Sequence, residues 1–160
     1  LSHVFSWPLD RCVDSLLDPN AALVPGERFG GHQVRQHMGR WDQHVRSWAD
    51  QNQLPVLIMR YEDMLAKGSE TFTELATFLG LPNDAHLIDQ ALENTSIDRL
   101  KKLEEDVDGF AEKPAGCERF FRSGRTGEGA EQLSIEQRKR LANGLSEAMN
   151  RFEYKGPELD

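Results

Sequence analysis

Twelve consecutive residues, Glu118 to Gly129, hold the side chains whose types could do chemistry. This stretch has the sequence ERFFRSGRTGEG, with three arginines, two adjacent phenylalanines and three glycines. Arginine binds phosphate through two parallel hydrogen bonds, and glycines let consecutive backbone N–H groups turn towards an anion. The phenyl rings could offer a flat apolar face to a purine. The stretch therefore predicts a loop that closes over a nucleotide phosphate. The alternative is a solvated arginine–glycine loop that its phenylalanines attach to the core, and composition alone does not separate the two.

The charge of the chain limits what such a loop could bind. The 160 residues carry a net charge of −8, and 38% of them are hydrophobic, enough for one domain with a core of its own. An acidic surface repels nucleic acid and anionic membranes, so phosphate recognition must be local. No apolar run approaches the ~20 residues that would span a bilayer. Cys12 and Cys117 lie far apart without a C-x-x-C pattern, which favours reduced thiols in the cytoplasm over a disulfide framework.

Two arrangements of polar residues resemble metal sites but lack necessary ligands. His37 and His44 are seven residues apart with Asp42 between them, whereas a helical metal site usually places two histidines four residues apart. The segment Glu104–Gly109 resembles the front of a calcium-binding loop. Its twelfth position is Ala115, where a bidentate glutamate is needed. The sequence therefore predicts no metal.

One strand, at residues 54–60, and several helices are expected to support the loop. The segment Leu54–Met59 is continuously apolar, which is typical of a parallel-type strand buried on both faces. Such a strand needs neighbours, and no second run of this quality occurs, so the sheet partners are missing from the chain or come from another molecule. At its end, Glu62 and Asp63 could form an acid–base pair or cap a helix, and we favour capping. Apolar residues at helical spacing predict helices over 9–17, 34–48, 72–79, 87–92, 97–103 and 141–152.

Several of these helices carry end signals. Ser134 with Gln137, and Thr71 with Glu74, have the spacing of a capping box. Gly80, followed by an apolar residue and a proline, predicts a left-handed helix end. Asn83 and Asp84 predict the start of the next helix. The interruption Asn94-Thr95-Ser96 is expected to place a pair of hydroxyl groups at a helix N-terminus, where a base or an anion could bind.

Taken in order, five stretches resemble the C-terminal half of the sulfotransferases that use 3′-phosphoadenosine 5′-phosphosulfate. They are GRWDQHVRSW, LPVLIMRYEDM, TFTELATFLGL, NTSIDRL and FFRSGRTGEG. The resemblance covers nearly the whole chain. It implies an α/β fold, the helix-rich C-terminal part of a three-layer fold like that of the P-loop NTPases. It also implies that residues 1–160 are one partial domain that lacks the N-terminal half with its phosphosulfate loop.

The resemblance assigns five residues to the adenine of the nucleotide. Tyr61 matches the tyrosine at the end of the family's strand, and Thr95 matches a hydroxyl that contacts the base. Ile97 replaces an aromatic residue that usually stacks nearby. Phe120 and Phe121 match the pair beside the purine.

Four further residues are assigned to the 3′-phosphate. Arg122, Ser123 and Gly124 match an Arg-Lys-Gly run in which Ser123 replaces the lysine, and Arg125 could compensate for the lost cation. The family's catalytic histidine, its phosphosulfate-loop lysine and an arginine–serine pair have no counterpart here, so no catalytic residue is assigned. We expect weak nucleotide binding at best and no turnover by this chain alone.

Two other interpretations stay open. A non-catalytic, all-helical protein-interaction domain explains the apolar helical stripes but neither the isolated strand nor the arginine loop. A P-loop kinase relative would need a G-x-x-x-x-G-K-[ST] loop, which does not occur in these residues. The expected partners are the nucleotide co-substrate and an acceptor that the sequence does not identify, without nucleic acid or membrane. An unpaired sheet edge would also favour self-association.

Overall fold

The computed structural model of the chain describes residues 2, 6–23, 34–106 and 119–154. The chain divides into two compact units. The first unit contains Leu1–Leu54, Pro114–Glu118 and Gly127–Asp160, and the second contains Pro55–Lys113 and Arg119–Thr126. The expectation of a single domain stays a prediction.

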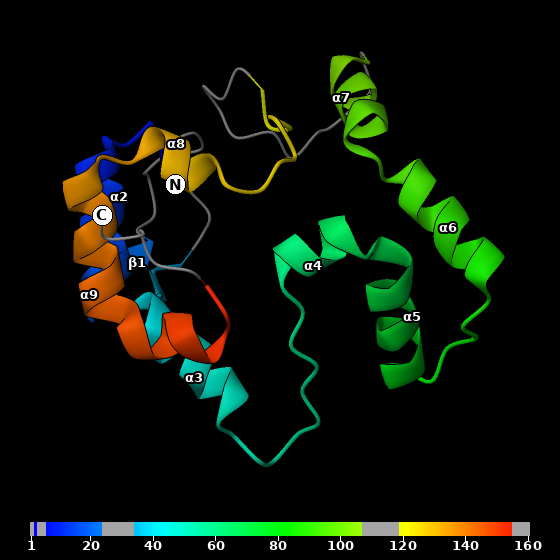
Figure 1. The fold of residues 1–160 in the computed structure, drawn as a ribbon, viewed down its shortest axis with the longest axis horizontal. Helices are drawn as coiled ribbons and strands as arrows, with labels where there is room; N and C mark the ends of the chain where they lie inside the picture. Colours follow the sequence, from blue (N-terminus) through cyan, green and yellow to red (C-terminus); the bar gives the residue numbers. More distant parts are fainter. Residues whose placement is uncertain (1, 3–5, 24–33, 107–118, 155–160) are drawn as a thin grey trace. The chain divides into compact units, whose positions relative to one another are not determined.

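Helix α9 is the centre of the first unit. The elements described there are α2 (Leu9–Leu17), β1 (Ala22–Leu23), β2 (Gln36–His37), α3 (Trp41–Ala49), α8 (Glu128–Gln132) and α9 (Ile135–Arg151). Helix α9 packs against both α2 and α3 (Figure 1). The buried apolar side chains described there come from α2, at Cys12 and Val13, and from α9, at Leu145 and Ala148, and α3 contributes none. The capping box predicted for α9 is confirmed, because Ser134 Oγ accepts from the Gln137 amide at 3.1 Å and Gln137 Oε1 accepts from the Ser134 amide at 2.9 Å.

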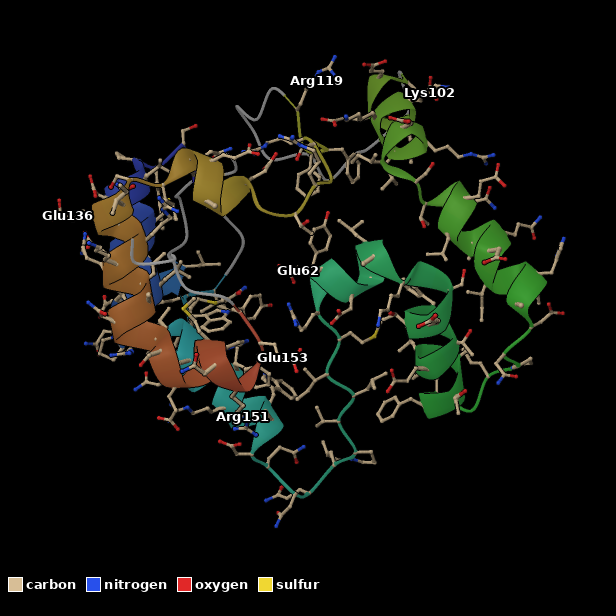
Figure 2. The ribbon with its side chains drawn as sticks, in the orientation of Figure 1. Glu62, Lys102, Arg119, Glu136, Arg151 and Glu153 are labelled. Atoms are coloured by element: carbon tan, nitrogen blue, oxygen red, sulfur yellow. The ribbon has the colours of Figure 1, made fainter. Side chains whose placement is uncertain are left out.

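Charged side chains join α9 to the same two helices at the surface. Arg140 donates to Asp14 on α2, and this hydrogen bond raises the pKa of the guanidinium group above its usual value. At the other end of the helix, Arg151 binds Asp50 at the end of α3 (Figure 2). Exposed ion pairs of this kind contribute little to stability.

The helix predicted over 34–48 is wrong in its first half, since α3 begins only at Trp41. The residues before it are used in a short antiparallel ladder, in which Ala22 pairs with His37 and Leu23 with Gln36. The amides of the two residues that follow β2, Met38 and Gly39, both donate to the carbonyl of Ala21, at 2.8 and 3.0 Å. Gly39 has φ +64°, a left-handed conformation that ends any continuous helix there. The backbone hydrogen bonds of this segment therefore go to a distant partner instead of to a helix.

The second unit is helical among the residues that the structure describes. It contains α4 (Tyr61–Ala66), α5 (Gly68–Phe78), α6 (Ala85–Asn94) and α7 (Ile97–Glu105), and α5 packs against both α4 and α6 (Figure 1). Two predicted helix ends are confirmed: Asp84 Oδ1 accepts from the His86 amide at 2.9 Å, and Gly80 takes a left-handed φ of +67°. The capping box predicted at Thr71 is wrong, because α5 begins at Gly68 and Thr71 lies inside it.

The strand predicted at residues 54–60 is also wrong. The ladder between β1 and β2 is the only one among the described residues, and 54–60 forms neither helix nor strand. Leu54, Val56 and Ile58 remain 66%, 40% and 52% exposed. The sequence pattern favours burial inside a sheet, but no described segment pairs with these backbone groups, and a strand needs such neighbours. A side chain holds the start of the segment instead, since Gln51 Oε1 accepts from the Leu54 amide at 2.9 Å.

Candidate functional site

All the residues that the resemblance assigns to nucleotide binding fall in the second unit. They lie at the start of α4, at the junction of α6 and α7, and on residues 119–126, which we call the arginine loop. The full set is Tyr61, Thr95, Ile97, Phe120, Phe121, Arg122, Ser123, Gly124 and Arg125. Within this set, the structure brings the arginine loop directly against α7.

The closest contact between the arginine loop and α7 is at Gly124. This glycine has φ +62°, and a Cβ atom added to it would lie 2.9 Å from Cγ1 of Ile97, the first residue of α7. A side chain at position 124 would therefore be strained twice, by its backbone conformation and by the collision. The glycine that was expected to help bind an anion also lets the loop pack on the helix.

The opposite end of α7 holds the start of the arginine loop. The Glu104 carboxylate accepts hydrogen bonds from the backbone amides of Phe120 and Phe121, at 2.6 and 3.0 Å, through its two different oxygens. Arg119 forms an exposed ion pair with Glu105 at 3.1 Å, and Figure 2 labels Arg119 on this loop. The rings of Phe120 and Phe121 meet edge to face, with centroids 5.2 Å apart. Both phenylalanines are half-buried, and the contact between their rings lies within the loop, so the hydrogen bonds to Glu104 attach this part of the loop to α7.

The cationic part of the arginine loop follows directly. Arg122 and Ser123 are half-buried, whereas Arg125 is exposed. Ser123 Oγ accepts from the Arg125 amide at 3.3 Å, which leaves its hydroxyl proton available to a ligand. Two guanidinium groups and a hydroxyl donor within four residues suit a phosphate chemically. The loop therefore carries suitable donors even though serine occupies the position of the expected lysine.

The two remaining candidates lie on separate elements. Tyr61 is the first residue of α4 and is 48% exposed. Thr95 ends α6, and its hydroxyl donates to the carbonyl of Ala91 at 2.8 Å. Ser96 is the N-cap residue of α7, but its side chain accepts no capping hydrogen bond from that helix. The predicted pair of hydroxyls is thus present at the junction, with the threonine proton already used by its own helix.

The acidic pair Glu62–Asp63 lies in the first turn of α4, where negative charge is favourable. The N-cap residue of α4 is Arg60, so the acidic pair lies in the first turn and not at the cap itself, and the capping expectation is met only in the favourable position of the charges. Asp63 Oδ2 lies 3.7 Å from Arg60 Nε. Glu62 Oε2 is buried and accepts no hydrogen bond from the residues that the structure describes. The acid–base interpretation therefore stays open beside the favourable helix position.

Among the described residues, each unit has a hollow lined mainly by apolar side chains. The first unit has a cavity of about 210 Å³ whose lining includes Trp7, Trp41 and His44. The second unit has one of about 260 Å³ between α5 and α6, and Thr95 forms part of its wall. The candidate base contact at Thr95 thus borders an apolar hollow.

Two classes of feature are absent from the described part of the chain. No group of three or more histidine, cysteine, aspartate or glutamate side chains there could hold a metal ion. No helix in those residues is both long and apolar enough to cross a membrane. Cys117 and the twelfth position of the calcium-like segment lie outside the described residues.

Sequence reasoning missed Glu104 as part of this site. Its carboxylate was considered only as the first ligand of an incomplete calcium loop. The pairing with the arginine loop spans sixteen residues of sequence, so no local pattern indicates it. A glutamate near the end of a helix, where acidic side chains are unfavourable, is a weak signal that could have been noticed.

Comparison with known proteins gives consistent matches. A family model described as "Sulfotransferase domain" matches residues 27–153. Bovine "Sulfotransferase 1E1" is 30% identical over 90 residues, which cover 56% of this chain and 30% of the relative. "Cytosolic sulfotransferase 1" of Arabidopsis thaliana is 28% identical over 122 residues, 72% of this chain and 37% of the relative. The chain thus spans about a third of the length of these curated relatives.

A solved structure shows a similar fold. The crystal structure of mouse sulfotransferase SULT7A1 complexed with PAP aligns with a TM-score of 0.56 at 22% identity, covering 70% of this chain and 42% of that one. This likeness indicates a sulfotransferase-like fold. Because the family model matches well over half of the residues, the chain belongs to the sulfotransferase domain family.

Proposed function

We propose that this chain carries the adenine- and 3′-phosphate-binding part of an enzyme that transfers a sulfuryl group. The donor would be 3′-phosphoadenosine 5′-phosphosulfate, and the acceptor a hydroxyl or an amine. Family membership supports sulfuryl transfer in general. The similar mouse sulfotransferase was crystallised as a complex with PAP, which supports a nucleotide of this class. The observation that carries the proposal is the arginine loop packed on α7, with Gly124 against Ile97.

In this proposal each part of the loop has its own task. The guanidinium groups of Arg122 and Arg125 and the hydroxyl of Ser123 would hold the 3′-phosphate. Phe120 and Phe121 would lie beside the purine. When bound, the nucleotide would supply the sulfuryl group that the acceptor takes up. The described residues would bind and orient the nucleotide, and no group acting on sulfur is assigned among them.

A titration with adenosine 3′,5′-bisphosphate and adenosine 5′-monophosphate tests the phosphate assignment. These ligands differ only in the 3′-phosphate, so the ratio of their affinities measures its recognition. Hydrogen bonds to charged groups contribute ~1.5–3 kcal/mol, and Arg122→Ala should lower the affinity for the bisphosphate about 10- to 100-fold. The affinity for the monophosphate should change little, so the ratio should fall towards one.

The control is Lys139→Ala, which removes one positive charge from an exposed position on α9 in the first unit. It should leave both affinities unchanged, whereas a non-specific charge effect would lower them. A chain that binds neither nucleotide would contradict the proposal and favour the helical interaction domain. Equal affinity of the unmodified chain for both ligands would contradict the 3′-phosphate role of the loop.

A further inference from the structure

The Glu104 carboxylate occupies a position that a ligand anion could otherwise take. Its two oxygens each accept from one of two consecutive backbone amides, those of Phe120 and Phe121. Consecutive N–H groups pointing the same way form a small anion-binding concavity. Here the protein fills it with its own carboxylate, at 2.6 and 3.0 Å. A phosphate on the arginine loop would therefore depend on side chains and on later amides.

Helix α7 contacts the arginine loop at both of its ends. Ile97, its first residue, lies against Gly124, and Glu104, its second-to-last, binds the two phenylalanine amides. At a rise of ~1.5 Å per residue, these contacts are about 10 Å apart along the helix. Arg122 and Ser123 lie between the two attachment points in sequence. The helix thus fixes the backbone on each side of the residues that would hold the phosphate.

We propose that Glu104 is a positioning residue of the nucleotide-binding loop. Its carboxylate holds the backbone at Phe120 and Phe121, which sets the direction in which Arg122 leaves the loop. It makes no contact with the nucleotide itself. We call the two hydrogen bonds from the Phe120 and Phe121 amides to Glu104 the tether. The inference rests on the proposed function for its effect on nucleotide affinity, whereas the tether is a property of the protein alone. Removing the tether should therefore loosen the loop first and weaken recognition of the 3′-phosphate as a result.

The neighbouring glutamate provides a matched pair of variants. Glu104→Gln keeps the shape of the side chain but replaces one accepting oxygen by an NH₂ group, which leaves one backbone amide without its acceptor. Glu105→Gln makes the same change of charge one residue away. It removes only an exposed ion pair in which the side chains of Glu105 and Arg119 are both 62% exposed.

Two measurements should be made on the whole chain. Amide hydrogen exchange at Phe120 and Phe121 should become about tenfold faster in Glu104→Gln, because a charge-assisted bond is lost. In Glu105→Gln the exchange rates of these two amides should equal those of the unmodified chain. Calorimetry should show that Glu104→Gln lowers the affinity for adenosine 3′,5′-bisphosphate about tenfold, with little change for adenosine 5′-monophosphate. Loss of selectivity distinguishes positioning from general destabilisation, which would lower both affinities together.

The outcomes separate this inference from the proposed function. Unchanged exchange in Glu104→Gln would overturn the tether. Faster exchange with unchanged selectivity would overturn the positioning role. If the unmodified chain binds neither nucleotide, the proposed function and the positioning role both fail, and the exchange data alone decide whether Glu104 holds the loop.

Discussion

The two units of this chain bury their apolar side chains to very different extents. All the described residues that are buried belong to the first unit, at Cys12, Val13, Leu145 and Ala148. No residue described in the second unit is buried. Large apolar side chains there stay at least 40% exposed at Val56, Ile58, Tyr61, Leu65, Phe78, Leu79, Leu81, Leu87 and Leu103.

This difference indicates that two kinds of interaction determine the local structure. In the first unit, apolar packing between α2 and α9 provides the main stabilisation among the described residues, since burying a side chain such as Val13 or Leu145 contributes ~1.5–3 kcal/mol. In the second unit, the arginine loop is positioned by hydrogen bonds from Glu104 and by the contact at Gly124. We therefore expect the first unit to respond most to changes of volume. The second should respond to changes of backbone geometry.

The largest effect is expected from the same substitution made once in each unit. Leu145→Ala removes a side chain that is 5% exposed, and the cavity left behind should cost ~2–5 kcal/mol of unfolding free energy. Leu87→Ala, in α6, removes one that is 55% exposed and should cost less than ~1 kcal/mol. Urea unfolding followed by circular dichroism measures both. Equal losses would show that the exposed leucines of the second unit are packed in solution.

The next effect tests the geometry of the second unit. Gly124→Ala places a Cβ in a left-handed conformation, which costs ~1–2 kcal/mol, and sets it 2.9 Å from Ile97. Gly80→Ala is the matched control, because Gly80 has φ +67° and no atom lies within 4 Å of its added Cβ. Gly124→Ala should lose more unfolding free energy than the control, by ~1–3 kcal/mol for the collision. An Ile97→Ala background removes Cγ1 at 2.9 Å and Cδ1 at 3.3 Å but keeps Cβ at 3.1 Å, so this excess should shrink there. An excess of unchanged size would contradict the contact.

The helix ends that the sequence predicted correctly depend on short-range interactions. The left-handed end at Gly80, the cap at Asp84 and the capping box at Ser134 each depend on residues two to five positions away. A local pattern contains both partners of such an interaction. Helix ends of this kind can therefore be recognised without any knowledge of the fold.

The wrong predictions concern pairings between distant residues. The helical pattern from Val34 continues through Gly39, and nothing local shows that Gln36 and His37 pair with β1. The run Leu54–Met59 has the composition of a buried strand, whereas strand formation depends on neighbours that the pattern does not contain. An apolar composition indicates that a segment would suit a buried strand. Whether neighbouring strands are there to pair with it depends on the rest of the fold.

In the candidate site, too, local features could be predicted from the sequence and contacts between distant residues could not. The residue types of the arginine loop could be recognised from the sequence, because arginine and glycine have specific uses around phosphate. Its support could not, since Glu104 lies sixteen residues from Phe120, and its weak signal, an acidic side chain near a helix end, is shared with Glu105. The contact of Ile97 with Gly124 likewise joins two segments that no periodicity relates.

The smallest effect compares two serines at the starts of helices, one in each unit. Ser134 caps α9 through the Gln137 amide, and Ser134→Ala should cost ~1 kcal/mol of unfolding free energy. Ser96 has the same position before α7 but makes no capping hydrogen bond with its side chain. Ser96→Ala should therefore cost only a few tenths of a kcal/mol of unfolding free energy. Thermal unfolding by circular dichroism resolves the difference if both variants are measured beside the unmodified chain. A loss at Ser96 as large as at Ser134 would mean that the Ser96 side chain caps α7 in solution, and that the arginine loop rests on a more firmly anchored helix.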